Sequence, residues 1–267
     1  MPVPKDKLRL GGMALRNGLL VHGPTHWAAA VRAPDGSVKV ASGPKPRVRA
    51  LDGVPVVSGL ARLAEGFAVI PLVRRRLPEA RLAFESPSVL GVAVATTLVA
   101  KVMKGGRASV AGEVGAATVS LAPALFALRD GELAAYHGVE HKAIAAYEAG
   151  DDDAADASKE HERCGSHLVA PMLAANVAGA LLIQRVLERP NALAAGAVSL
   201  ASAAVALEVF AWSERHAGSA AARALKRPGY EIQRLVGTRE PDERQLEVGR
   251  AALAEILRVE DGVPTPG

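Results

Sequence analysis

Four uncharged, largely apolar runs dominate the middle of the chain and divide it from two more polar ends. They cover residues 86–100, 114–128, 164–184 and 190–207. A helix that spans a bilayer needs about 20 mainly apolar residues, so the third run is long enough alone and the fourth is long enough with its flanks. The first two runs are shorter, and each predicts a spanning helix or part of a re-entrant or interfacial hairpin. Four clustered runs favour membrane insertion, while buried helices of a soluble all-α domain are the alternative.

The residues before these runs predict a small β module. HWAAAVR and SVKVAS flank a PDG turn, which is the pattern of a hairpin with Asp35-Gly36 in a tight turn. Residues 56–82 then predict one or two amphipathic, basic helices. After residue 215 the chain is polar again, and Asp242 is a candidate N-cap for a final helix. On that helix one face would carry Leu246, Gly249, Leu253 and Leu257.

The predicted fold is mainly α, with a multi-pass membrane helical core and a small N-terminal β module. Four segments follow from the pattern: the β-rich module at 1–55, amphipathic basic helices at 56–85, a membrane-associated helical core at 86–215 that contains a loop at 129–167, and a C-terminal cytoplasmic tail with one helix at 216–267.

Charge bears on the predicted orientation in the membrane. Residues 1–85 carry 14 Lys and Arg against 6 Asp and Glu, whereas residues 129–163 carry 4 against 10. If all four runs cross, both termini and residues 129–163 lie on one side, and the basic N-terminal arm places that side in the cytoplasm. The positive link KVMKGGR would then lie outside, which argues against this orientation. The N-terminus, MPVPKDKLRL, lacks the apolar core of a signal peptide.

Other features narrow the expected partners. The formal net charge of +4 is mild, and the chain shows no RNA-binding aromatic motif, zinc ribbon or helix-turn-helix pattern. We therefore expect the lipid bilayer as a partner and no nucleic acid, and no pattern indicates an oligomeric state. The single cysteine, Cys164, excludes an internal disulfide and leaves a thiol that is buried, reactive or bound to metal.

The segment YHGVEHKAI carries the clearest chemical signal. His137 and His141 are four residues apart, so on a helix they project from one face, one turn apart. Glu140 lies beside them, in the H-x-x-E-H arrangement of inverted zincins. Two imidazoles in this arrangement can chelate a divalent ion, and the glutamate can take a proton from metal-bound water. The alternative is a pair of helix-face histidines that only form hydrogen bonds.

Two further features extend this candidate metal site. In KEHERCGSHLV, His161 and Cys164 are three residues apart and would make a second chelating pair suited to zinc or iron; the alternative is a polar helix start with a buried structural cysteine. Glu208 is a lone carboxylate near the end of the fourth apolar run, where an ionisable group faces a partner or a cavity. It is a candidate third ligand from another helix, or else an interfacial glutamate paired with Arg215.

These segments resemble the YqhQ-like family of bacterial multi-pass inner-membrane proteins, described as predicted metal-dependent enzymes of unassigned activity. YHGVEHKAI, YEAG and HERCGSHL are similar to its central signature, GGMALRNGLLVHGP and WAAAVR to its opening module, and PGYEIQRLVGTREPDERQLEVGRAAL to its closing segment. The resemblance implies roles for six matching residues and for a carboxylate after the last membrane segment, which is Glu208 here. The six are His137, Glu140, His141, Glu148, His161 and Cys164.

The chain also departs from the family pattern. Asn17 stands where the family usually has glutamate, His22 stands in place of an arginine, and Ser58 replaces another arginine; His167 is not a family feature. We therefore interpret the chain as a divergent member whose substrate or partner contact has changed.

Together these features predict a metal-dependent membrane enzyme at the cytoplasmic membrane boundary. Its most natural reaction is hydrolysis of an unknown substrate, with Glu140 as general base and a divalent metal, zinc or else iron or manganese, held by His137, His141, His161, Cys164 and Glu208. The alternative is a non-catalytic membrane scaffold, carrier or metal sensor with a structural His/Cys site. A structural site is closed by four protein ligands, whereas a catalytic site keeps one position open.

Overall fold

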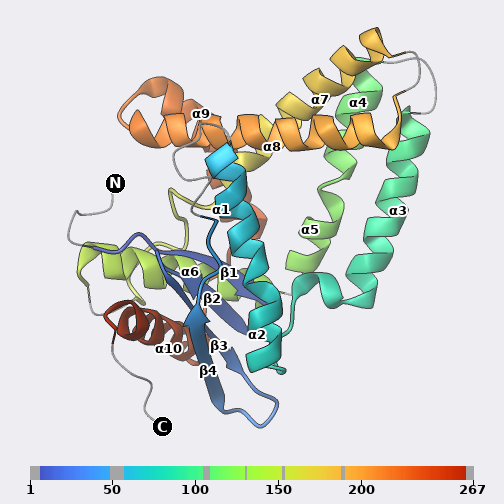
Figure 1. Ribbon diagram of the computed structural model, residues 1–267. Helices are drawn as coiled ribbons and strands as arrows, with labels where there is room; N and C mark the ends of the chain where they lie inside the picture. Colours follow the sequence, from blue (N-terminus) through green and yellow to red (C-terminus); the bar gives the residue numbers. More distant parts are fainter. Residues whose placement is uncertain are drawn as a thin grey trace.

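The computed structural model describes residues 7–48, 57–104, 109–129, 131–151, 154–187 and 190–262. It shows a four-stranded sheet with helices on both faces, next to a group of long helices (Figure 1). The predicted fold class is confirmed, because the described chain is mainly helical and has an N-terminal antiparallel sheet. The predicted boundary between residues 55 and 56 lies outside the described residues.

The sheet is an antiparallel meander in the order β1-β2-β3-β4. Its strands are β1 (Gly11–Leu15), β2 (Gly18–His22), β3 (His26–Arg32) and β4 (Val38–Pro44). The predicted hairpin is confirmed by the pairing of β3 with β4, and Gly36 in its turn has a φ of 85°. A positive φ is a conformation that glycine adopts without steric cost.

Both faces of the sheet are buried, because alternate residues of a strand point to opposite sides. On one face, Leu19 and Ala28 pack with residues of α6 (Glu132–Ala149) and α10 (Glu243–Glu260). On the other face, Leu20 and Trp27 pack with α2 (Ile70–Arg76) and the residues that follow it. This two-sided burial explains why β3 reads as the nearly continuous apolar run WAAAV.

The final helix begins where the sequence predicts, because Asp242 caps α10 and forms a capping box with Gln245. Its buried face differs from the predicted one. Leu246 and Gly249 are buried as expected, but Ala252 and Ile256 complete the face, and Leu253 and Leu257 are only partly buried. The difference arises because the helix packs against both the sheet and α6. These contacts bury a face that is rotated by about one residue from the face that carries the leucines.

The remaining helices join the sheet to a second group of helices. Their bounds are α1 (Val57–Ala68), α2 (Ile70–Arg76), the short 3₁₀ helix η2 (Ala83–Glu85), α3 (Pro87–Lys104), α4 (Val110–Val119), α5 (Ala122–Leu128), the 3₁₀ helix η3 (Gly165–Leu168), α7 (Val169–Val186), α8 (Ala192–Arg215), α9 (Ala220–Ile232) and the π-helical turn η4 (Gln233–Gly237).

Four segments of the described chain are long and apolar enough to cross a membrane, as judged by length and composition: Pro87–Lys104, Val110–Leu128, Gly165–Val186 and Ala192–Arg215. Between 6% and 17% of each of them is buried inside the protein, and the rest is partly or fully exposed. Leu182 is 61% exposed and Leu193 is 81% exposed. The second segment is broken between α4 and α5, where Pro123 lies in the first turn of α5.

One polar cluster lies among these helices. Glu113 on α4 is 4% exposed; its Oε2 lies 2.7 Å from Lys104 Nζ, and its Oε1 accepts a hydrogen bond of 2.7 Å from Gln184 Nε2 on α7. The cluster therefore ties α3, α4 and α7 together with polar contacts within an otherwise apolar group.

Candidate metal centre

Helix α6 positions the two histidines of the H-x-x-E-H segment. It runs between Gly131 and Gly150, which have φ values of 88° and 73°, and glycine is the residue that adopts this left-handed conformation most readily. His137 and His141 lie one turn apart on this helix, as predicted, with ring centroids separated by 4.4 Å.

Cys164 comes to the same place from a separate segment that precedes η3. Its Sγ is 3.3 Å from His137 Nε2. One donor atom from each of His137, His141 and Cys164 lies within 4.8 Å of the other two, so the three residues form a group that could hold a metal ion. His141 and Cys164 are buried, and His137 is partly buried.

Backbone carbonyls orient both imidazoles. His137 Nδ1 is 2.8 Å from the carbonyl oxygen of Gly237, and His141 Nδ1 is 2.6 Å from that of Lys159. A carbonyl oxygen only accepts, so Nδ1 must carry the hydrogen in both rings, and the lone pair of each neutral ring is on Nε2. This is the arrangement in which metal-ligating histidines are usually held. Burial also lowers the pKa of His141, which favours the neutral form that can act as a ligand.

Glu140 lies beside the three donors and is 7% exposed. Burial raises the pKa of its carboxyl group, and the nearby His137 and His161 oppose that shift. A Cβ atom at Gly12 would lie 2.7 Å from the carboxyl group of Glu140. Glycine in β1 therefore leaves the space that this side chain occupies, which gives the glycine-rich start of the module a physical role.

The structure leaves His161 outside the group of three donors. Its Nδ1 accepts a hydrogen bond of 3.2 Å from the backbone N–H of Arg163, and its Nε2 lies 3.7 Å from Glu148. Both nitrogens of His161 are therefore directed to other groups. Burial raises the pKa of Glu148, but hydrogen bonds from His161 and Arg163 outweigh that effect, so the pKa is lowered.

The other residues singled out by the sequence lie elsewhere. Glu208 is on α8 and is not part of the donor group. His167 is buried, and its Nδ1 is 2.9 Å from the carbonyl oxygen of Lys226. Asn17 joins the sheet to the chain after α2, since its amide donates to the carbonyl of Glu79 and accepts from the N–H of Arg81.

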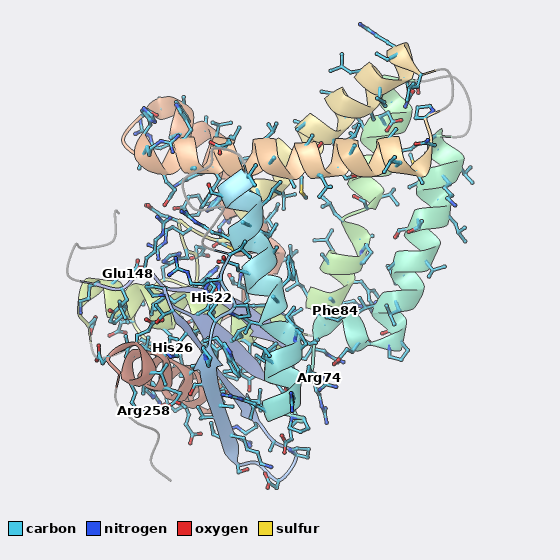
Figure 2. The ribbon with its side chains drawn as sticks, viewed as in Figure 1. His22, His26, Arg74, Phe84, Glu148 and Arg258 are labelled. Carbon is cyan, nitrogen blue, oxygen red and sulfur yellow. The ribbon has the colours of Figure 1, made fainter. Side chains whose placement is uncertain are left out.

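The donor group opens into a large cavity of about 1070 Å³. Glu140, His161 and Cys164 line this cavity together with His22 from β2; Figure 2 labels His22. Burial, and to a smaller extent the charge of Lys45, lower the pKa of His22 to about 4. Ser58 lies in the first turn of α1.

The sequence did not point to Gln233, which holds the cysteine segment in place. Gln233 is fully buried; its Oε1 accepts a hydrogen bond of 2.7 Å from the N–H of His161, and its Nε2 donates one of 2.9 Å to Ser166 Oγ. Gln233 begins η4, whose last residue, Gly237, supplies the carbonyl that orients His137. Single π-helical turns of this kind occur frequently at functional sites.

The segments that build the centre also correspond to a recognised family. Residues 132–259 match the family described as Protein of unknown function (DUF1385). The matched region contains all three donors, Glu140 and the η4 turn, and it ends within α10. No curated protein and no solved structure matches the chain.

Proposed function

We propose that the protein is a metal-dependent membrane enzyme, most naturally a hydrolase, whose metal is held by His137, His141 and Cys164. The observation that carries the proposal is the convergence of these three donors at the edge of a large cavity that Glu140 also lines. Three protein ligands leave one position of a tetrahedral site open, which is the arrangement of catalytic rather than structural zinc centres.

The donor set fits zinc best among the candidate metals. Two imidazoles and one thiolate suit zinc, and iron is an alternative, whereas manganese prefers oxygen ligands. A zinc ion bound there would supply Lewis-acid chemistry and a water with a pKa near 7. The chain itself contributes two things. The carbonyl groups of Gly237 and Lys159 orient the two histidines, and Glu140 provides a buried carboxyl group. Burial raises the pKa of Glu140, which makes its carboxylate a stronger base for the proton that it would take up and return.

We also propose that the protein is a multi-pass inner-membrane member of the YqhQ-like family with cytoplasmic termini. The four long apolar segments support the membrane part of this proposal. Their outward-facing leucines and valines would form an unusually large apolar surface on a soluble protein. In this arrangement α6 and the sheet lie on the cytoplasmic side, with the cavity at the membrane boundary.

The test measures metal and activity in the same preparations. Protein purified in detergent should contain about one zinc per chain by mass spectrometry, and His141→Ala should lose most of it, because two remaining ligands rarely hold a divalent ion. Glu140→Gln should keep the metal but lose about 10²–10⁴-fold in the rate of hydrolysis of a panel of chromogenic carboxylic and phosphate esters. The control is His216→Ala, at the exposed C-terminal end of α8, with unchanged metal and activity.

Three outcomes would contradict this proposal. A Glu140→Gln variant without metal would make Glu140 a ligand and end the comparison with inverted zincins. A Glu140→Gln variant that keeps both metal and function would show that the centre is structural, as in a scaffold, carrier or sensor. Wild-type protein that contains no transition metal would remove the metal centre itself.

A second candidate function is thiol catalysis without metal, and it has its own supporting observation. Cys164 Sγ is within hydrogen-bond distance of His137 Nε2, and Gly237 orients that ring, which is the geometry of a nucleophile with its general base. Thiol catalysis does not require His141, whereas the metal centre does. If His141→Ala lacks metal but still reacts with iodoacetamide at the wild-type rate and retains hydrolysis, the thiol alternative replaces the metal centre.

A further inference from the structure

The cavity beside the donor group is larger than a metal-bound water or a small anion requires. Its volume is about 1070 Å³, whereas sites for small organic molecules usually occupy about 300–1,000 Å³. A ligand of lipid size could therefore lie in it. The charges and apolar surfaces of its wall indicate the chemistry of that ligand.

Cationic side chains predominate among the charged residues of the wall. The described lining contains five Lys and Arg against two acidic residues: Arg9, Lys45, Arg47, Arg62 and Arg163 against Glu65 and Glu140. Arg163 already forms an ion pair with Glu148.

Lys45, Arg47 and Arg62 form one group, which we name the Lys45 cluster. All three residues line the cavity, and burial together with the charges of Arg47 and Arg62 lowers the pKa of Lys45. The negative charges of Glu65 and Glu260 raise the pKa of Lys45 instead. Both carboxylates also accept backbone hydrogen bonds, Glu65 from the N–H of Val48 at 2.7 Å and Glu260 from that of His26. The cluster therefore combines a partly buried lysine with two exposed arginines, and its three positive charges face two carboxylates.

The Lys45 cluster lies at the end of the sheet that faces the donor group. Lys45 is close enough to His22 to lower its pKa, and His22 pairs with Gly11 across β1 and β2. The next residue, Gly12, leaves the space for the carboxyl group of Glu140. An anionic group bound at Lys45 would thus lie along the same wall as the proposed reaction centre.

Another part of the wall is apolar and comes from other elements. Phe84 from η2, which is 52% exposed, Leu128 from α5 and Phe210 from α8 contribute to it. Figure 2 labels Phe84, on the side of the molecule where α3 and α5 lie. Helices α5 and α8 belong to segments long and apolar enough to cross a membrane, so the apolar wall continues into the surface that we propose to contact lipid.

From this wall we propose that the cavity binds an anionic amphiphile, with a phosphate head group at the Lys45 cluster and a hydrocarbon tail between Phe84, Leu128 and Phe210. The idea that this amphiphile is the substrate rests on the proposed function. The idea that the cavity binds it does not depend on that function. Arginine and lysine suit a phosphate, since guanidinium groups bind its oxygens in pairs and ammonium groups add a point charge.

The experiment measures binding to the detergent-purified full chain by native mass spectrometry. The probes are dioctanoyl phosphatidic acid, dioctanoylglycerol, which lacks the phosphate, and inorganic phosphate, which lacks the tail. Phosphatidic acid should bind at least about tenfold more tightly than either of the others, because only it uses both parts of the wall. Equal binding of dioctanoylglycerol would overturn the charge assignment, and equal binding of inorganic phosphate would show that the ligand is a free anion.

Matched variants locate the head group. Lys45→Gln and Arg62→Gln should each weaken phosphatidic acid binding about tenfold and leave the binding of dioctanoylglycerol unchanged. Arg250→Gln on α10, which is paired with Glu243 outside the cavity wall, should retain wild-type affinity. If both cluster variants bind phosphatidic acid like the wild type, the Lys45 cluster is not the head-group site.

Metal content separates this proposal from the preceding one. Lys45→Gln and Arg62→Gln should keep the wild-type metal stoichiometry, which also shows that the centre is folded. The metal-free His141→Ala protein should still bind phosphatidic acid. Loss of lipid binding with intact metal would therefore count against the amphiphile alone, and absence of metal with intact lipid binding would count against the metal centre alone.

Discussion

At the scale of single residues, His22 illustrates how burial changes the chemistry of a side chain. It lies in the cavity wall, and its pKa is lowered from 6.5 to about 4 by burial and by Lys45. A neutral imidazole beside the cationic Lys45 cluster avoids the repulsion that a permanently charged arginine would add there.

The lowered pKa of His22 predicts a loss of stability at acidic pH. Because the unfolded chain takes up the proton more readily than the folded one, the stabilisation is complete above pH 6.5 and falls as the pH drops toward 4, by up to about 3 kcal/mol. His22→Gln should show a flatter pH dependence of its unfolding midpoint over this window, measured in detergent by thermal denaturation. His22→Phe provides the control, since it also cannot titrate. The same slope in the wild type and both variants would contradict the prediction.

At the scale of elements, the centre depends on a segment far along the chain. The η4 turn lies about a hundred residues after His137, yet Gly237 orients that histidine and Gln233 holds the segment with His161 and Ser166. The donor from Cys164 is therefore placed by a polar side chain that the H-x-x-E-H pattern does not contain.

Replacing Gln233 by leucine should release the cysteine segment. The buried N–H of His161 and the hydroxyl of Ser166 would lose their partner, and disturbance of residues behind metal ligands typically costs about 10–100-fold in metal affinity. The measurement is a zinc competition titration of the purified variant, with the exposed neighbour Arg234→Gln as the matched control. Wild-type affinity in Gln233→Leu would show that the segment is held by other contacts.

At the scale of the whole molecule, the sheet and the long helices give the protein two different surfaces. The sheet with α6 and α10 has a core buried on both faces, whereas at most 17% of each of the four long apolar segments is buried inside the protein. The cavity contains residues from both parts, which places the proposed chemistry at their boundary.

This division predicts that the protein is found in the membrane fraction and requires detergent for extraction. Leu182→Arg, which places a charge at an outward position on α7, should reduce membrane insertion, since a central arginine costs about 2.5–3.5 kcal/mol. Leu182→Ala is the control and should insert normally. Recovery of monodisperse wild-type protein without detergent would contradict the prediction, and so would insertion of Leu182→Arg into the membrane fraction at the wild-type level.

The sequence alone determined the features that depend on neighbouring residues. The spacing of His137 and His141, the hairpin at Asp35-Gly36 and the cap at Asp242 follow from local backbone geometry, and all three are found where they were predicted. The apolar runs likewise indicate the long helices, because length and hydropathy are properties of a continuous segment.

Only the tertiary structure decided which distant groups meet. Spacing alone paired Cys164 with His161, but the fold directs both nitrogens of His161 elsewhere and brings the thiol to His137 and His141. It also buries Ala252 and Ile256 of α10 in place of the leucine stripe. The physical reason is the same in both cases: a side chain's orientation follows from the surface packed against its element, and in this protein that surface comes from residues many positions away in the sequence.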